Sequence, residues 1–334
     1  MFSLPDSYVW DFWLADDGDQ YHLFFLYASK ALKNPDARHY RASVGHAVSG
    51  DLTNWTRVVD ALVRSDPPAF DELATWTGSV VRGDDGLWHM FYTGTSLTPD
   101  GNIQSIGAAT SPDLYDWTKN PGNPILTADV RWYERLSDGH WHDEAFRDPW
   151  VYWDERAGQW RMLITARANH GSPDDRGVIG TALSPDLSTW TLQPPLSAPG
   201  AGFGQLEVLN TAEIDGTSVL FFSCLAPDLA ASKRASGTTG GIWAIVPDAD
   251  GRWDPNDAQQ LTDDGLYVGR VVRERDTGES LFFAFENVGS DGTFVGRITD
   301  PRSISLQEGR LTLGDPRPAG STEVPQLGIG TPAG

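Results

Sequence analysis

The sequence predicts an all-β protein, a five-bladed β-propeller with four-stranded antiparallel blades around a central channel. Three observations predict it: a turn followed by a hydrophobic run recurs five times, a strand-turn-tryptophan signature recurs three times, and helical periodicity is scarce. Equivalent points in the five runs are separated by 67, 72, 58 and 62 residues, a length that accommodates four short strands and their turns. These points are Phe24, Phe91, Leu163, Phe221 and Phe283.

Each of the five runs predicts a β-hairpin. Gly and Asp supply the turn conformations, and the aromatic and β-branched residues that follow favour strand. The runs are DDGDQYHLFFLYA (16–28), GDDGLWHMFYTG (83–94), DERAGQWRMLITA (154–166), EIDGTSVLFFSC (213–224) and RDTGESLFFAFE (275–286).

The second signature follows the first three runs. It reads GHAVSGDLTNW (45–55), GAATSPDLYDW (107–117) and GTALSPDLSTW (180–190). Each copy predicts a strand, a turn opened by Ser and Asp, and a Trp that packs back onto the sheet. Generic hairpins of a β-sandwich are the alternative, and the recurrence of both signatures favours the propeller.

The strand before each hairpin is expected to be the innermost of its blade and to line the channel. These strands begin VWDFWLA (9–15), WTGSVVR (76–82), FRDPWVYW (146–153), LEVLNTAE (206–213) and YVGRVVRE (267–274). We assign residues 1–314 to the propeller and the Pro- and Gly-rich residues 315–334 to a C-terminal tail, part of which could pair with the first blade.

Three acids begin inner strands at nearly the same place. Asp11 lies 13 residues before its hairpin point, Asp148 lies 15 before and Glu207 lies 14 before. Because side chains alternate across a strand, these acids share faces with Trp13, with Trp150 and with Gln205, respectively. Three neighbouring carboxylates repel one another and cost stability, so a purely structural protein has little reason to gather them. The sequence therefore predicts that they form an active site in the central channel.

Several neighbouring side chains are candidates for binding the substrate. Tryptophans beside the acids suit the apolar face of a sugar ring, and Thr77, Ser79 and Arg270 stand at the matching offset in the second and fifth blades. Core packing is the alternative for each tryptophan. We expect Arg147 to support Asp148 from the other strand face. The full set is Trp10, Trp13, Trp76, Thr77, Ser79, Arg147, Gln205 and Arg270.

Composition excludes several classes of protein. A net charge of −21 argues against nucleic-acid binding, which requires clustered Lys and Arg. The one cysteine, Cys224, excludes an intrachain disulfide, and no CxxC or HExxH spacing indicates a metal site. We expect no cofactor, with a structural calcium ion left open. We also expect a cytoplasmic protein, because neither a signal peptide nor a membrane-spanning run is visible.

Paired carboxyl groups are the machinery of glycoside hydrolysis. One protonates the leaving oxygen while a second acts as nucleophile or activates water, and a third can orient the sugar. The sequence therefore predicts an enzyme that acts on a small carbohydrate.

The chain resembles the five-bladed propeller furanosidases: invertases and fructanases of glycoside hydrolase family 32, levansucrases of family 68, and arabinanases and xylosidases of family 43. VWDFW is similar to the levansucrase VWDSW, FRDPWV to the Arg-Asp-Pro motif of both fructosyl-handling families, and WTGSVV with FYTG to their SGS and YTG segments. The resemblance implies Asp11 as nucleophile, Asp148 as a transition-state stabiliser that binds sugar hydroxyls, and Glu207 as general acid/base.

The predicted function is a retaining glycoside hydrolase that releases terminal β-fructofuranosyl residues through a covalent intermediate on Asp11. An arabinofuranosidase, perhaps inverting, is the alternative, since a carboxyl separation of about 5–5.5 Å implies retention and about 6.5–9.5 Å inversion. A non-catalytic sugar-binding propeller and a phosphorolytic enzyme are further alternatives. Phosphorolysis would need a cationic pocket, for which Arg270 is the candidate on the inner strands. The oligomeric state is not determined by these patterns.

Overall fold

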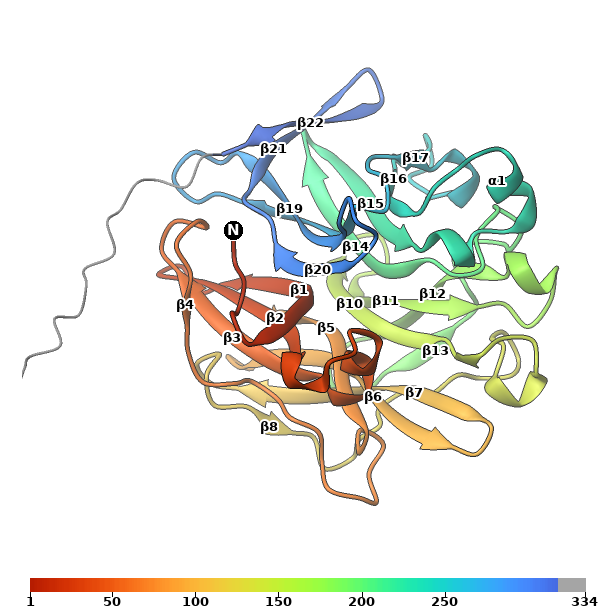
Figure 1. Cartoon of the computed structure of the whole chain (residues 1–334), viewed down its shortest axis with the longest axis horizontal. Coiled ribbons are helices and arrows are strands. Elements are labelled where there is room, and N and C mark those ends of the chain that lie inside the picture. Colours follow the sequence, from red (N-terminus) through yellow and green to blue (C-terminus); the bar gives the residue numbers. More distant parts are fainter. Residues whose placement is uncertain (318–334) are drawn as a thin grey trace, which may run out of the picture.

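Five antiparallel sheets contain almost all the regular structure of the protein. The computed structural model describes residues 1–317 of the chain. In three sheets four strands follow one another in sequence order, and the other two sheets each have a fifth strand outside that order, β9 paired with β7 and β20 paired with β19. The sheets are arranged radially, with β1, β5, β10 and β14 near the middle of the view (Figure 1). The predicted five-bladed propeller is therefore confirmed.

The strands of each blade have the following bounds. The first blade has β1 (Ser7–Asp16), β2 (Tyr21–Ser29), β3 (Ser43–Ser49) and β4 (Thr56–Arg57). The second has β5 (Ala74–Arg82), β6 (Trp88–Thr98), β7 (Gly101–Ser111), β8 (Thr118–Lys119) and a short parallel addition, β9 (Asp143–Glu144). The third has β10 (Phe146–Asp154), β11 (Gln159–Arg167), β12 (Gly177–Ser184) and β13 (Thr191–Gln193).

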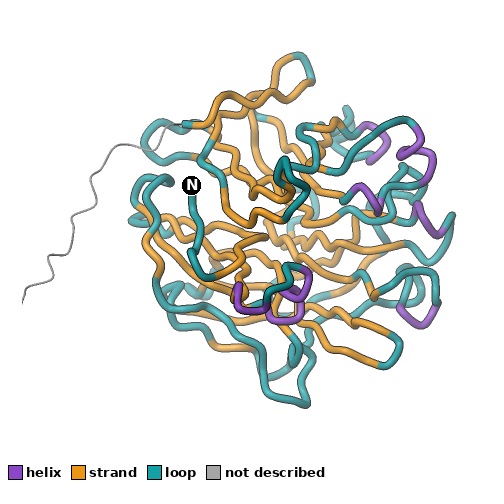
Figure 2. The backbone as a smooth tube through the Cα atoms, viewed as in Figure 1, coloured by secondary structure: helices purple, strands orange, loops and turns teal. Residues whose placement is uncertain are grey.

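The fourth blade has β14 (Glu207–Ile214), β15 (Thr217–Cys224), β16 (Gly241–Ile245) and β17 (Gln259–Gln260). The fifth has β18 (Leu266–Arg273), β19 (Ser280–Val288), β20 (Phe294–Ile298), β21 (Arg302–Gln307) and β22 (Arg310–Pro316). A single short α-helix in the described part of the chain, α1 (Ala231–Ala235), lies in the connection between β15 and β16. Helical turns lie in the connections between strands (Figure 2).

One glycine in the turn of each predicted hairpin adopts a left-handed backbone conformation. The φ values are +95° at Gly18, +81° at Gly86, +59° at Gly158, +78° at Gly216 and +69° at Gly278. Residues with a Cβ rarely adopt such values, which explains why glycine recurs in the turn of every run.

The tryptophan signature joins neighbouring blades. Trp117 packs edge-on against Phe24 of the first blade, and Trp190 packs edge-on against Phe91 of the second. Each indole nitrogen donates to the carbonyl of the leucine three residues earlier, at 2.9 Å and 3.0 Å. These tryptophans therefore contact the preceding blade, whereas the sequence predicted packing onto their own sheet.

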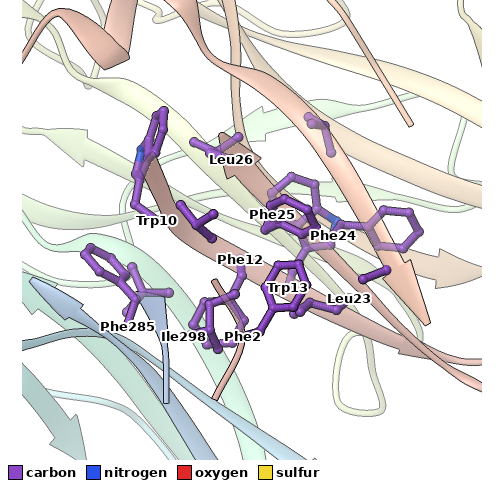
Figure 3. Close-up of a cluster of buried hydrophobic side chains, with 14 of the residues drawn as sticks. Phe2, Trp10, Phe12, Trp13, Leu23, Phe24, Phe25, Leu26, Phe285 and Ile298 are labelled. Atoms are coloured by element: carbon purple, nitrogen blue, oxygen red, sulfur yellow. The ribbon is translucent and has the colours of Figure 1, made fainter. Parts of the chain in front are cut away.

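The ring closes between the first and fifth blades. Phe2 pairs with Ile298 at the end of β20, and its amide donates to the Ile298 carbonyl at 2.9 Å. The buried side chains of Phe2, Phe12 and Ile298 meet at this junction (Figure 3). Strand β22 runs to Pro316, two residues past the predicted boundary at 314. Residues 318–334 of the predicted tail lie outside the described residues.

Candidate active site

A cavity of about 880 Å³ contains most of the predicted site. All three acids line it, together with five of the other predicted side chains. The predicted residues found in its wall are Trp10, Asp11, Trp76, Thr77, Arg147, Asp148, Gln205 and Glu207. Trp13, Ser79 and Arg270 do not line it.

A β-bulge interrupts every innermost strand at the same register. The pairing shifts between Trp10 and Phe12 in β1, and between Trp76 and Gly78 in β5. The three other inner strands shift in the same way. Their breaks lie between Arg147 and Trp150, between Glu207 and Asn210, and between Tyr267 and Arg270. A bulge adds one residue and reverses the alternation of side chains beyond it.

The bulges correct the predicted equivalence of the three acids. Asp11 and Asp148 both lie two residues before the position that pairs with the hairpin point, at Trp13 and Trp150. Glu207 lies three residues before the corresponding Asn210. Glu207 therefore occupies the register of Arg147, one residue before that of Asp148. The sequence prediction assumed that side chains alternate regularly between the two faces of a strand, and a bulge ends that regularity.

Hydroxyl groups from the preceding blade hold three of the bulges. The amide of Asp148 donates to Thr93 at 2.9 Å, that of Val208 to Thr165 at 3.1 Å, and that of Val268 to Ser223 at 3.0 Å. The three donating residues have φ values of +59°, +54° and +56°. Left-handed conformations are costly for residues with a Cβ, so these contacts stabilise a strained backbone at the site.

Beyond the bulges, one residue from each inner strand contributes to a layer that joins neighbouring blades. We call it the inter-blade layer, and it consists of Trp13, Ser79, Trp150, Asn210 and Arg270, which pair with the five hairpin points. Four contacts link successive blades: Val151 N to Ser79 Oγ (3.1 Å), Trp150 Nε1 to Thr211 Oγ1 (3.1 Å), Asn210 Nδ2 to the Gly269 carbonyl (2.9 Å) and Arg270 Nε to the Phe12 carbonyl (3.0 Å).

The inter-blade layer corrects three predicted substrate contacts. Trp13 is fully buried and stacks on Phe24, apart from Trp10 (Figure 3). Ser79 and Arg270 are buried in contacts between blades. Because the bulge reverses the strand face, these side chains join the blades and Trp13 does not share the cavity with Asp11.

Asp11 faces the second blade. Its Oδ2 accepts a hydrogen bond of 2.5 Å from the Thr77 hydroxyl. Burial raises the pKa of Asp11, and the nearby charge of Glu207 adds to the rise, while the Thr77 hydrogen bond opposes it. Thr77 is the bulge residue of β5, so the two bulges place donor and acceptor side by side.

Asp148 is almost fully enclosed. Its Oδ2 accepts from the Thr165 hydroxyl at 2.9 Å and from the Val208 amide at 3.2 Å. Burial raises the pKa of Asp148 to about 7, although the Arg147 guanidinium opposes the shift. The carboxyl group is thus fixed in orientation and sits near its titration midpoint at neutral pH.

Glu207 is held on both carboxylate oxygens. Arg147 and Gln205 donate to Oε1, the latter at 3.2 Å, and the phenol of Tyr267 donates to Oε2. Sequence reasoning missed Tyr267, which lines the same cavity. Tyr267 precedes the bulge of β18 as Glu207 precedes that of β14, so locating the bulges in the repeat would have found it.

Arg147 lies in the wall of the cavity itself, where the sequence predicted support from the opposite face. Its Nη2 donates to Glu207 and, at 2.6 Å, to Gln205 Oε1, while its Nε lies 3.5 Å from Asp148 Oδ2. Burial lowers the pKa of Arg147, but the surrounding carboxylates, Glu207 foremost, outweigh burial and raise it. Arg147 therefore stays charged and ties two of the three acids together.

A helical turn of the first blade, Asp36–Arg41, adds residues that sequence reasoning missed. Arg38 lines the cavity with its guanidinium carbon 3.9 Å from the ring centre of Phe294. The carbonyl of His39 accepts from the Trp76 indole at 2.7 Å, which orients that ring in the wall. The turn lies between the predicted strands and carries no repeat signal.

Comparison with known proteins shows the family of this chain. Residues 14–313 match the family described as Glycosyl hydrolases family 32 N-terminal domain. The chain belongs to glycoside hydrolase family 32. The family 32 match includes Asp148 and Glu207 and begins three residues after Asp11, so the assignment of Asp11 to the site rests on the cavity geometry.

Curated relatives of this family 32 chain include an insoluble isoenzyme of beta-fructofuranosidase from Arabidopsis thaliana. It is 29% identical over 190 residues, covering 56% of this chain and 32% of the relative. The chain thus spans about a third of that relative's length. An inulosucrase from Halalkalicoccus jeotgali bound to kestose has a similar structure, with a TM-score of 0.76 and 22% identity over 97% of this chain and 92% of that chain.

A Bombyx mori GH32 beta-fructofuranosidase also has a similar structure, with a TM-score of 0.67 and 18% identity over 94% of this chain and 65% of that chain. At these identities, both structural likenesses establish the fold.

Within residues 1–317, no helix is long and apolar enough to cross a membrane. The same residues contain no group of three or more His, Cys, Asp or Glu side chains placed to hold a metal ion. The predicted absence of a cofactor stays a prediction, as does the cytoplasmic location.

Proposed function

We propose that this family 32 chain is a retaining β-fructofuranosidase that releases terminal fructosyl residues from small neutral saccharides. One observation carries the proposal: Asp11, Asp148 and Glu207 line a single cavity, each with different hydrogen-bond partners. Different environments allow chemically similar carboxyl groups to take different roles.

In the first step, a carboxylate oxygen of Asp11 attacks the anomeric carbon of the fructosyl unit. The bond from that carbon to the glycosidic oxygen breaks, and Glu207 gives its proton to the departing oxygen. In the second step, Glu207 takes a proton from water, whose oxygen attacks the same carbon and frees Asp11. Asp148 binds sugar hydroxyls whose contacts strengthen as positive charge develops on the ring.

The contacts of Glu207 support one location for its proton. Oε1 faces Arg147 and the amide nitrogen of Gln205, which only donate hydrogen bonds. Oε2 faces the Tyr267 hydroxyl, which can donate or accept. A proton on Glu207 is therefore best accommodated on Oε2, from which it can pass to the leaving oxygen.

The phosphorolytic alternative loses its support, because Arg270 donates to the Phe12 carbonyl in the inter-blade layer and does not line the cavity. The arabinofuranosidase alternative differs from the proposal in the substrate that is cleaved. An inverting mechanism differs from it in the anomer that is released first.

The test compares the full chain with Asp11→Asn and Glu207→Gln on sucrose, kestose and an arabinofuranoside. We expect the wild type to release fructose, first as the β-anomer in NMR spectra, and Glu207→Gln to lower kcat about 10²–10⁴-fold. Asp19→Asn, in an exposed hairpin turn, is the matched acid-to-amide control. Full activity of Glu207→Gln, or cleavage of the arabinofuranoside alone, would overturn the proposal.

A further inference from the structure

A buried guanidinium in the cavity wall has no role yet in the proposed reaction. Arg38, from the helical turn Asp36–Arg41, is 8% exposed and lines the cavity together with Asp11. Within residues 1–317, the one hydrogen bond of its side chain runs from Nη1 to the Pro35 carbonyl, at 2.9 Å, and no carboxylate accepts a hydrogen bond from it. Burying a charge without a bound counter-charge is unfavourable, so the place of Arg38 needs a physical reason.

Two aromatic rings hold this guanidinium in place. Its central carbon lies 3.9 Å from the ring centre of Phe294, in β20 of the fifth blade, and 5.3 Å from that of Trp10, in β1 of the first blade. The face of an aromatic ring attracts a cation. Because Trp10 directly precedes Asp11, the two rings place the charge of Arg38 beside the part of β1 that carries Asp11.

Asp11 is the main negative charge that acts on Arg38. An oxygen of Asp36 lies 3.9 Å from Nη1 of Arg38, but the Asp36 side chain is 96% exposed, so water screens this pair. Burial lowers the pKa of Arg38 to about 10, and Asp11 opposes that shift more than Asp36 or Tyr8 does. The neighbouring His39 brings no charge, because burial, with the charge of Arg38 adding to it, lowers its pKa to about 3.

Asp11 in turn has Arg38 as its leading positive neighbour. Burial raises the pKa of Asp11, and of the two arginines that oppose the rise, Arg38 contributes more than Arg270, which lies in the inter-blade layer. The guanidinium of Arg147 is bound to Glu207 instead. The other charged groups that act on Asp11 are the carboxylates of Glu207 and Asp148. Arg38 is therefore the cation best placed to favour the charged form of Asp11.

We propose that Arg38 is the counter-charge of Asp11 and keeps its carboxylate ionised in both steps of the reaction. The inference rests on the proposed function and adds a positioning residue that acts through Asp11. In the first step, only the ionised carboxylate can form the bond to the anomeric carbon. In the second step, that bond breaks and its electron pair returns to the Asp11 oxygen, so the same positive charge stabilises the departing carboxylate.

The first measurement is the pH dependence of kcat/KM for sucrose, whose acidic limb reports ionisation of the free enzyme. Arg38→Met removes the charge and keeps a long side chain for the two rings, whereas Arg38→Lys keeps the charge. We expect the acidic limb of Arg38→Met to move up by about one pH unit, because Asp11 then loses its proton only at higher pH. Arg38→Lys should show less than about half of that shift.

Arg41→Met is the matched control, since Arg41 belongs to the same turn, is exposed and does not line the cavity. Its acidic limb should coincide with that of wild type. A loss of activity in Arg38→Met that is equal at every pH would overturn the inference, because Arg38 would then bind the substrate or shape the wall. An equal shift in Arg38→Met and Arg38→Lys would overturn it as well.

The second measurement needs no substrate. It is a double-mutant cycle of urea unfolding at pH 8 with Arg38→Met and Asp11→Asn, in which the effect of losing Arg38 is compared with and without the Asp11 charge. We expect Arg38→Met to lower the urea midpoint at most about half as much in Asp11→Asn as in wild type. Equal losses in both would overturn the counter-charge. A wild type that cleaves no fructoside would overturn the proposed function, while the cycle would still decide whether the two residues are coupled.

Discussion

The phenol of Tyr267 donates a hydrogen bond to Oε2 of Glu207, and both residues stand at the same register in adjacent blades. Burial raises the pKa of Tyr267, with the charge of Glu207 adding to the rise, so the phenol stays neutral. A neutral phenol can donate to the carboxylate and then accept from the carboxylic acid as the proton moves.

Removing this hydroxyl should weaken acid catalysis without unfolding the protein. We expect Tyr267→Phe to lower kcat for sucrose about tenfold, because Oε2 loses its one partner among the described residues. The loss should shrink for a fructoside with a better leaving group, which needs less protonation. Kinetics on both substrates check this, and an equal loss on both would contradict a role in positioning the proton.

Asp148 should make stability depend on pH. Burial raises its pKa to about 7 from an ordinary value of 3.8, so the folded chain favours the protonated form more than the unfolded chain does. Its contribution to the free energy of unfolding is therefore fully present below pH 4 and is lost as pH rises through 7, with an upper limit on the order of 4 kcal/mol.

The variant Asp148→Asn should remove this dependence. Its amide oxygen can still accept from Thr165 and from the Val208 amide, so we expect it to be at least as stable as wild type at pH 8. Activity should fall about 100-fold or more at the same pH. Urea unfolding at pH 5 and pH 8 checks the prediction. Asp11, whose pKa burial also raises, leaves some dependence of the same sign.

Trp13 should contribute to folding and not to substrate binding. It is fully buried against Phe24 in the inter-blade layer. We expect Trp13→Leu to lower the free energy of unfolding by about 2–3 kcal/mol through the cavity it leaves. The KM for sucrose should stay within about twofold of wild type. A large rise in KM with unchanged stability would instead support the contact predicted from the sequence.

The charge of the cavity should select against anionic sugars. Among residues 1–317, six carboxyl groups line it, at Asp11, Asp36, Asp143, Asp148, Glu207 and Asp228, against the two guanidinium groups of Arg38 and Arg147. We expect kcat/KM for sucrose 6-phosphate to be at least about tenfold below that for sucrose, because a phosphate dianion is repelled. Added salt should narrow the gap by screening. Equal rates at low salt would contradict this expectation.

Much of the fold could be predicted from the sequence because each repeated hairpin is specified by residues close together in the chain. Each hairpin combines a glycine that accepts a positive φ with a short hydrophobic strand, as at Gly18 before Phe24. Spacing then places the preceding strand innermost, and this was enough to bring Asp11, Asp148 and Glu207 into one cavity.

The side-chain assignments that depended on strand alternation, as for Trp13, or on a matching offset, as for Arg270, failed where the bulges interrupt the strands. Trp13 and Arg270 lie beyond a bulge and belong to the inter-blade layer, while Tyr267, just before one, lines the cavity unpredicted. Arg38 lies in a helical turn outside the repeat, so no equivalent residue in another blade could predict its place in the cavity wall.

The sequence by itself determined the number of blades, the order of the strands and the three acids, because turn chemistry and hydrophobic runs act between residues close in the chain. Only the tertiary structure decided which way each acid points and what holds it. The bulge at Asp148 depends on Thr93 of the preceding blade, and Glu207 depends on Arg147 and Tyr267 on either side. Such contacts form only when distant blades pack, so local sequence pattern does not encode them.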